Sequence, residues 1–226
     1  MNNAVTRTAK LCLLFALATS TSFSLKALTI NDVWINEINY DEPGTDTGEF
    51  VEIAGIAGTD LSSLTLVEYN GNGGGTNGSL SLTGILSNTH AGYGFLSFLF
   101  PTNGLQNDDE GLALVEGSTV IQFLSYEGSF QATNGPANGQ TSADIGVSET
   151  NSTPAGFTLQ FLGHADNGSW TGPIASTSGS INTGQVLPDL SANNPSDSTP
   201  VPNSGATLGL LGLGLAAIAT LKRRKP

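Results

Sequence analysis

Two short segments of the chain concentrate side chains that end in oxygen: Asp41, Glu42, Asp46 and Glu49 in the first, and Asn107, Asp108, Asp109 and Glu110 in the second. Calcium binds about six to eight such oxygens. Neither segment matches the EF-hand loop or the calcium-binding nonapeptide repeat, and an acidic loop can simply be solvated. Acidic loops are usually just solvated, and the alternative that we carry forward as a prediction is a weak calcium site with these candidate ligands: Asp41, Asp46, Glu49, Asp108, Asp109 and Glu110.

The charge distribution supports that prediction and excludes other partners. All seven Lys and Arg residues lie near the two ends, so none falls between Ala27 and Leu221, where all 19 Asp and Glu residues are found. A divalent cation would relieve the repulsion among these carboxylates. Binding to a nucleic-acid backbone needs Lys or Arg to neutralise phosphates, so the sequence predicts no nucleic-acid partner.

Other chemistry is weakly represented. Glu37 and Glu52 could be the paired carboxylates of a glycosidase, but no cluster of sugar-stacking aromatic residues accompanies them, and we favour hydrogen bonds to backbone donors at a sheet edge. His90 and His164 have no partner at useful spacing. No nucleophile elbow, phosphate loop or His-Glu-x-x-His motif is present. A Ser-His-Asp triad, which is assembled only in space, stays open.

The N-terminal segment has the layout of a secretory signal peptide. Arg7 and Lys10 precede the apolar run 11–18, which is too short to span a bilayer and is followed by Thr and Ser residues. We expect cleavage after Ala27, with sites near residues 20–22 as alternatives. The only cysteine, Cys12, would be removed with residues 1–27, so the mature chain would contain no disulfide.

The C-terminal segment predicts a membrane anchor. Residues 187–200 are polar and rich in proline, which is typical of a disordered linker. An apolar run over 206–221 then ends at a basic cluster: Lys222, Arg223, Arg224 and Lys225. Counted from Val201, a helix would be about 31 Å long, and the basic cluster would stay in the cytoplasm. The alternative is a buried C-terminal helix of a soluble domain.

Between the linker and the apolar run stands a short motif: Val201, Pro202, Asn203, Ser204 and Gly205. The order of motif, apolar helix and basic cluster resembles the PEP-CTERM class of bacterial sorting signals, in its Val-Pro-Asp-Ser-Gly subclass. Asn203 stands where that subclass has Asp. The resemblance implies export across a Gram-negative-type envelope, a hold on the inner membrane, and processing near the motif by an exosortase-type enzyme, followed by release or attachment at the cell surface.

Residues 28–186 show an all-β pattern, in which short apolar runs are interrupted by Gly, Asn, Asp and Pro. Gly117 and Ser118 predict a tight hairpin. In residues 93–100, apolar side chains occur at both odd-numbered and even-numbered positions, which point to opposite faces of a strand. We therefore expect a central strand covered on both faces. The pattern predicts two packed sheets with strands at 33–39, 50–53, 64–69, 79–82, 94–100, 112–116, 119–125 and 157–162, and a weaker one at 169–171.

Three stretches of this region carry a second resemblance: residues 35–38 (Ile-Asn-Glu-Ile), 48–53 (Gly-Glu-Phe-Val-Glu-Ile) and 58–66 (Gly-Thr-Asp-Leu-Ser-Ser-Leu-Thr-Leu). They resemble the lamin-tail domain, an immunoglobulin-like β-sandwich. Some bacterial relatives of this kind carry an attached nuclease domain, for which this chain has no room. The resemblance implies an interaction module without catalytic residues.

Together these features predict an exported, non-enzymatic β-sandwich that acts through adhesion or contacts with a matrix polymer or surface protein. A secreted metal-dependent hydrolase, or a protein associated with a nuclease, is the alternative. A hydrolase of that kind would need a carboxylate metal site and would lose its activity in chelator.

Overall fold

The computed structural model describes residues 26–191. The predicted signal peptide up to residue 25, the sorting motif, the apolar run and the basic cluster lie outside these described residues. Within them, no helix is long and apolar enough to cross a bilayer. The described part of the chain consists of strands and their connections: β1 (Val33–Asn39), β2 (Phe50–Ile56), β3 (Leu64–Asn70), β4 (Thr76–Ser81), β5 (Tyr93–Leu99), β6 (Glu110–Glu116), β7 (Thr119–Ser125), β8 (Ala143–Asp144), β9 (Phe157–Phe161) and β10 (Trp170–Ala175).

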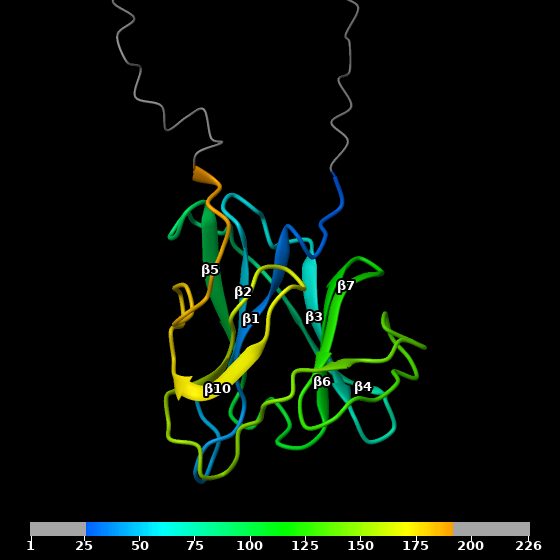
Figure 1. Ribbon diagram of the computed structural model, residues 1–226. Coiled ribbons are helices and arrows are strands. Elements are labelled where there is room, and N and C mark those ends of the chain that lie inside the picture. Colours follow the sequence, from blue (N-terminus) through cyan, green and yellow to red (C-terminus); the bar gives the residue numbers. More distant parts are fainter. Residues whose placement is uncertain (1–25, 192–226) are drawn as a thin grey trace, which may run out of the picture.

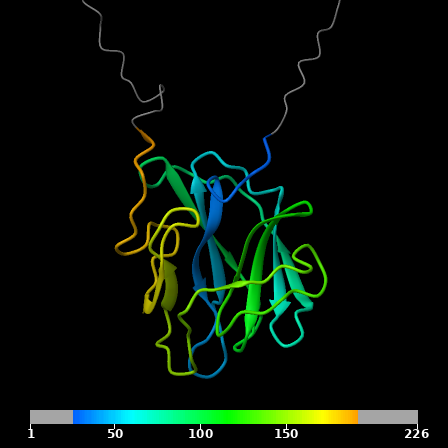
Figure 2. The same ribbon diagram turned by 45° about the vertical axis from the view of Figure 1, so that its right-hand side comes forward.

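The strands form two five-stranded sheets packed face to face as a β-sandwich (Figures 1 and 2). The first sheet has the order β10-β9-β1-β2-β5, and the second has the order β4-β3-β6-β7-β8. All pairs are antiparallel except β7 with the two-residue strand β8. The predicted all-β fold with two sheets is confirmed, and all nine predicted strands overlap observed ones.

The space between the sheets is filled by the alternate apolar residues of both layers. Ile35, Ile38 and Ile53 of the first sheet pack there with Leu66 and Leu114 of the second, and all are fully buried or nearly so. The predicted tight hairpin between β6 and β7 is also observed. Gly117 adopts a φ of +60° in its turn, a conformation that glycine reaches without strain.

Each outer face of the sandwich is covered by a connection rather than left to solvent. On the second sheet, Tyr69, Val115 and Phe123 are covered by Ala132 and Ala137. On the first sheet, Trp34, Tyr93 and Phe161 are covered by residues 176–190, which we name the strap; its apolar residues there are Ile181, Leu187 and Leu190. Because Leu187 and Leu190 pack against the sheet, the folded part continues beyond residue 186, where the linker was expected to begin.

The expectation of a central strand over residues 93–100 is wrong. β5 pairs only with β2 and forms one edge of the first sheet, while β1 and β2 occupy its interior. The first half of β5 is buried, but exposure increases along the strand, and Leu99 is 71% exposed. Alternation of apolar residues reports how many faces of a strand are covered. It does not report how many neighbouring strands it has.

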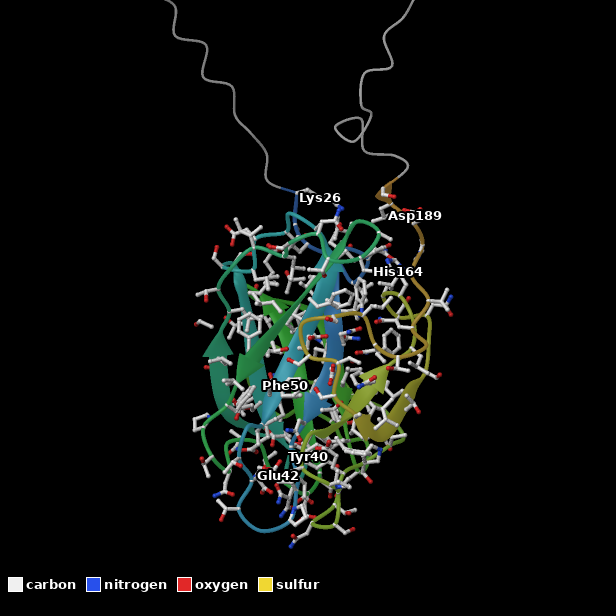
Figure 3. The ribbon with its side chains drawn as sticks, turned by 90° about the vertical axis from the view of Figure 1, so that its left-hand side faces the viewer. Lys26, Tyr40, Glu42, Phe50, His164 and Asp189 are labelled. Carbon is white, nitrogen blue, oxygen red and sulfur yellow. The ribbon has the colours of Figure 1, made fainter. Side chains whose placement is uncertain are left out.

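The two ends of the described chain leave the sandwich at the same end, near Lys26 and Asp189 (Figure 3). We name this the terminal end. Tyr40 and Glu42 lie at the opposite end, which we name the acidic end. Lys26 forms the single ion pair of the described residues, 3.0 Å from Asp32 at the terminal end.

Candidate functional site

The acidic end is built from loops that leave strands of both sheets. The loops after β1 and β5 belong to the first sheet, and the loops after β3 and β7 belong to the second. They line an open polar pocket of about 900 Å³. Its lining consists of carboxylates, amides and glycine backbone: Asp46, Asn70, Gly71, Asn72, Gly73, Asn103, Leu105, Gln106, Asn107, Asp108, Asp109 and Glu127.

The structure brings the two predicted acidic segments into contact. Asn107 Nδ2 donates to Asp46 Oδ2 at 2.9 Å and to Asp41 Oδ1 at 3.3 Å. Asp108 and Asp109 follow in the same loop, are exposed and line the pocket. Four of the six predicted calcium ligands, Asp41, Asp46, Asp108 and Asp109, therefore gather around Asn107.

The remaining two predicted ligands serve the loops instead. Glu49 is fully buried and accepts backbone hydrogen bonds from Gly104 N at 2.8 Å and Leu105 N at 3.0 Å. Glu110 is also fully buried, and its Oε2 accepts from the backbone N of Gln106. Neither lines the pocket. Each carboxylate fixes the course of the loop after β5, which carries Asn107 and Asp108.

The loop after β1 is organised in the same way. Glu42 Oε1 accepts from Thr47 N at 2.7 Å and from Thr47 Oγ1 at 3.0 Å, while Glu42 N donates to Asp46 Oδ1 at 3.0 Å. Both acidic side chains are almost completely buried. Because the described loops have no basic partner for these carboxylates, backbone amides and hydroxyls satisfy them.

Sequence reasoning missed two further carboxylates at the acidic end, Glu127 and Glu149. Glu149 Oε2 accepts from Tyr40 N at 2.5 Å and from Asp41 N at 3.0 Å, although 109 and 108 residues separate these partners. Glu127 Oε1 accepts from Tyr40 Oη at 2.8 Å. The ring of Tyr40 stacks on Tyr126 with centroids 3.9 Å apart. No spacing along the chain could have indicated these contacts.

Burial and neighbouring negative charges raise the pKa values of two carboxyl groups at the acidic end, Glu149 and Glu110. Burial raises the pKa of Glu149 to about 8, and the charges of Asp41 and Glu42 add to the effect. Burial also raises the pKa of Glu110 to about 8, helped by Glu68 and Glu49. Oε1 of Glu149 and Oε1 of Glu110 are buried without a hydrogen-bond partner. Ionising either carboxyl is therefore costly in this structure.

This arrangement can attract cations and donate or accept hydrogen bonds through the Asn and Asp side chains of the pocket. Among residues 26–191, however, no three His, Cys, Asp or Glu side chains are grouped so that they could hold a metal ion. Calcium at the acidic end stays a prediction. Any site would have to draw on amide and backbone oxygens of the pocket as well as carboxylates.

Glu37 and Glu52 are not part of the acidic end. They are neighbours on β1 and β2 in the interior of the first sheet, not at its edge as expected, and both are fully buried. Glu37 Oε1 accepts from Thr158 Oγ1 at 2.6 Å, from Ser176 Oγ at 2.7 Å and from Thr177 N at 3.0 Å. These contacts and the burial of both carboxylates favour the hydrogen-bonding interpretation over that of a glycosidase pair.

Glu52 fixes the next part of the strap. Its Oε2 accepts from Gly179 N at 2.6 Å and from Ser97 Oγ at 3.1 Å, and its Oε1 accepts from Asn36 Nδ2 at 3.0 Å. The pairing of β1 with β2 shifts register between Ile35 and Glu37, and such a bulge places an extra residue on one face. Both carboxylates thus hold the strap to the outer face of the sheet.

The histidines are placed as packing or surface residues. His164 packs edge-on against Trp34 and Tyr93, with ring centroids 5.0 Å and 5.6 Å apart, and burial lowers its pKa. His90 is exposed in the loop before β5. Neither lines the acidic pocket.

Comparison with known proteins found a match for the C-terminal segment alone. Residues 200–225 match the family model of the VPDSG-CTERM motif. No curated protein and no solved structure matched the chain. The chain thus carries a C-terminal sorting signal of this type, which indicates an exported protein.

Proposed function

We propose that the chain is an exported, non-enzymatic binding module, displayed at or shed from a bacterial surface, whose acidic end makes adhesive or matrix contacts. The observation that carries the proposal is the opposite placement of the two ends of the sandwich. The described chain leaves at the terminal end, and the polar pocket lies at the acidic end (Figure 3). A domain tethered through its C-terminal segment would present the acidic end away from the tether.

The sorting signal supplies the second step. Under this proposal an exosortase-type enzyme processes the motif at residues 201–205, after residues 206–221 have held the chain in the inner membrane as a helix. The sandwich would belong to the lamin-tail type that residues 35–38, 48–53 and 58–66 resemble. Such a module contributes a rigid scaffold with variable loops, and binding functions concentrate on loops of this kind.

The chemistry of the pocket limits the partner. Carboxylates without basic neighbours repel anionic polymers and attract groups that carry positive charge. Amide side chains, such as those of Asn72 and Asn107, can exchange hydrogen bonds with hydroxyl groups. We therefore propose a matrix polymer or surface protein that presents ammonium or hydroxyl groups as the partner.

The test uses the two exposed carboxylates of the pocket. In the double variant Asp108→Asn/Asp109→Asn, two charges are lost while the size of each side chain is kept. Asp109 has a φ of +42°, a region that Asn adopts readily, so the loop should survive the change. The matched control is Asp144→Asn/Asp166→Asn, which removes two exposed charges outside the pocket.

Retention of each purified protein on cells that lack the native copy is then measured. We expect wild type and control to be retained and the pocket variant to be lost from the cell surface. Equal retention of both double variants would refute a role for the acidic end. Turnover of nuclease, esterase or glycosidase substrates that stops in chelator would instead favour the metal-dependent hydrolase.

A further inference from the structure

β5 forms one of the two edges of the first sheet and has an apolar composition that is unusual for an edge strand. β5 has the sequence Tyr-Gly-Phe-Leu-Ser-Phe-Leu, which contains no charged residue and no proline. It pairs with β2 over its whole length without a register shift, so it is neither bulged nor interrupted. A long, regular and apolar edge strand is a template for pairing with another strand.

The other three sheet edges carry the features that normally prevent such pairing. β10 contains Pro173 and pairs irregularly with β9. β4 is polar, mostly exposed, and pairs with β3 through a register shift. β8 is only two residues long. β8 covers only the last two residues of β7, but β7 pairs with β6 through a register shift. Among the free strand edges of the described chain, β5 is the one that pairs regularly along its whole length and has the composition of a central strand.

Hydrogen-bond alternation shows which backbone groups of β5 are free. Phe100 N donates to Glu49 O, and Gly92 O accepts from Ala57 N, so even-numbered residues point their backbone groups toward β2. Tyr93 points outward and bonds to His90. The remaining outward residues, Phe95, Ser97 and Leu99, make no backbone hydrogen bond to the rest of the described chain.

We propose that β5 pairs with β5 of a second copy of this chain, antiparallel and across a two-fold axis at Ser97. In this register Phe95 meets Leu99 of the second copy and Ser97 meets itself, so every free outward N–H and C=O is paired. A two-fold axis at Leu96 would instead place Leu99 opposite Tyr93, whose outward groups are already used. The observed hydrogen bonds thus select the register.

Side chains and charge agree with a second copy as the occupant. On the inner face, Leu96 would meet Phe98 of the second copy, and both are only partly buried in the single chain. On the outer face, the exposed Leu99 would lie opposite Phe95 of the second copy. When a strand pairs with the same strand of a second copy, each charged residue lies near an identical charge, which is repulsive. β5 has no charged residue, so no such repulsion arises. Antiparallel pairing points the two acidic ends in opposite directions, which separates these repelling regions. It also points the two terminal ends in opposite directions, so the dimer fits chains shed from the surface rather than two chains tethered side by side.

Leu99→Pro tests the pairing of the two β5 strands with little change to the single chain. The N–H of Leu99 points away from β2, so proline removes a donor that only the second copy would use, at a position that is 71% exposed. Leu99→Val is the matched control, because it keeps the N–H. The full-length chain is purified in mild detergent, and its protein mass is measured by size-exclusion chromatography with light scattering.

We expect dimers for wild type and Leu99→Val and loss of the dimer for Leu99→Pro. A monomeric wild type, or a Leu99→Pro variant that stays dimeric, overturns the proposal. Hydrogen exchange of the wild type gives a second readout that needs no variant. Amides of Phe95, Ser97 and Leu99 should exchange more slowly at high than at low protein concentration, and exchange independent of concentration would also overturn it. The proposal does not depend on the function assigned to the acidic end.

Discussion

Glu149→Gln should stabilise the sandwich at alkaline pH and flatten its pH dependence. Glu149 is fully buried, its Oε1 has no hydrogen-bond partner, and Asp41 and Glu42 lie near it. Gln keeps an oxygen for the backbone N–H groups of Tyr40 and Asp41, which bond to Oε2. Its amide nitrogen would occupy the position of Oε1 and carries no negative charge that Asp41 and Glu42 could repel.

The sign and size of the effect follow from the pKa. In the folded state the pKa of Glu149 is raised from its usual value of 4.5 to about 8, so the folded state binds more protons than the unfolded state across this interval. Its contribution to stability is therefore fully present below pH 4.5 and is lost as pH rises toward 8. The raised pKa corresponds to about 5 kcal/mol. Relaxation of the loop and entry of water reduce this penalty, so we expect about 1–3 kcal/mol.

The assay is urea denaturation of residues 26–191 between pH 5 and pH 9 in chelator. Wild type should become less stable as pH rises, and Glu149→Gln should lose stability with a smaller slope. Asp144→Asn, which removes one exposed charge, controls for the lower net charge and should keep the wild-type slope. The reasoning fails if the wild-type stability is constant over this range, or if Glu149→Gln and wild type have the same slope.

Three further predictions concern the ends and the strap. Millimolar calcium should raise the melting temperature at pH 8 beyond the effect of matched ionic strength, because a ligand of the folded state stabilises it; equal melting curves in calcium and chelator would leave the acidic loops simply solvated. Deleting residues 206–226 should release the protein into the medium, and a truncated chain still found in the membrane fraction would contradict the predicted anchor. Glu37→Ala should destabilise the domain by about 3–5 kcal/mol, since donors from Thr158, Ser176 and Thr177 lose their acceptor, and hydrogen exchange at Thr177 should accelerate; unchanged exchange there would show that Glu37 does not hold the strap.

The sequence predicted the strands well, because alternation and glycine-rich turns are local signals. The hairpin at Gly117 needed only its neighbours to be recognised. The placement of β5 could not be predicted in this way, because a strand at an edge and a strand at the centre can show the same alternation. Its edge position depends on which strands pair across the chain, and no local pattern encodes that.

The acidic end was predicted in part. Loops that follow β1 and β5 leave the same end of one sheet, so the contact between Asp46 and Asn107 follows from topology once the strands are known. The inward direction of Glu49 and Glu110 could not be predicted, because it depends on which backbone amides the folded loop leaves unpaired. The contribution of Glu149 depends on a contact across more than a hundred residues.

The lack of basic residues explains much of this architecture. An ordinary domain can pair its surface carboxylates with Lys or Arg, whereas Asp32 alone has such a partner among the described residues. The other buried carboxylates accept hydrogen bonds from backbone N–H and hydroxyl groups, so they lie where separate segments of the chain come together. Glu37 and Glu52 hold the strap in this way, and Glu49, Glu110 and Glu149 hold the loops of the acidic end. The exposed carboxylates of Asp108 and Asp109 have no basic partner and leave negative charge uncompensated around the pocket. Any partner or cation that binds there relieves repulsion already present in the folded chain, which gives the acidic end a physical reason to bind.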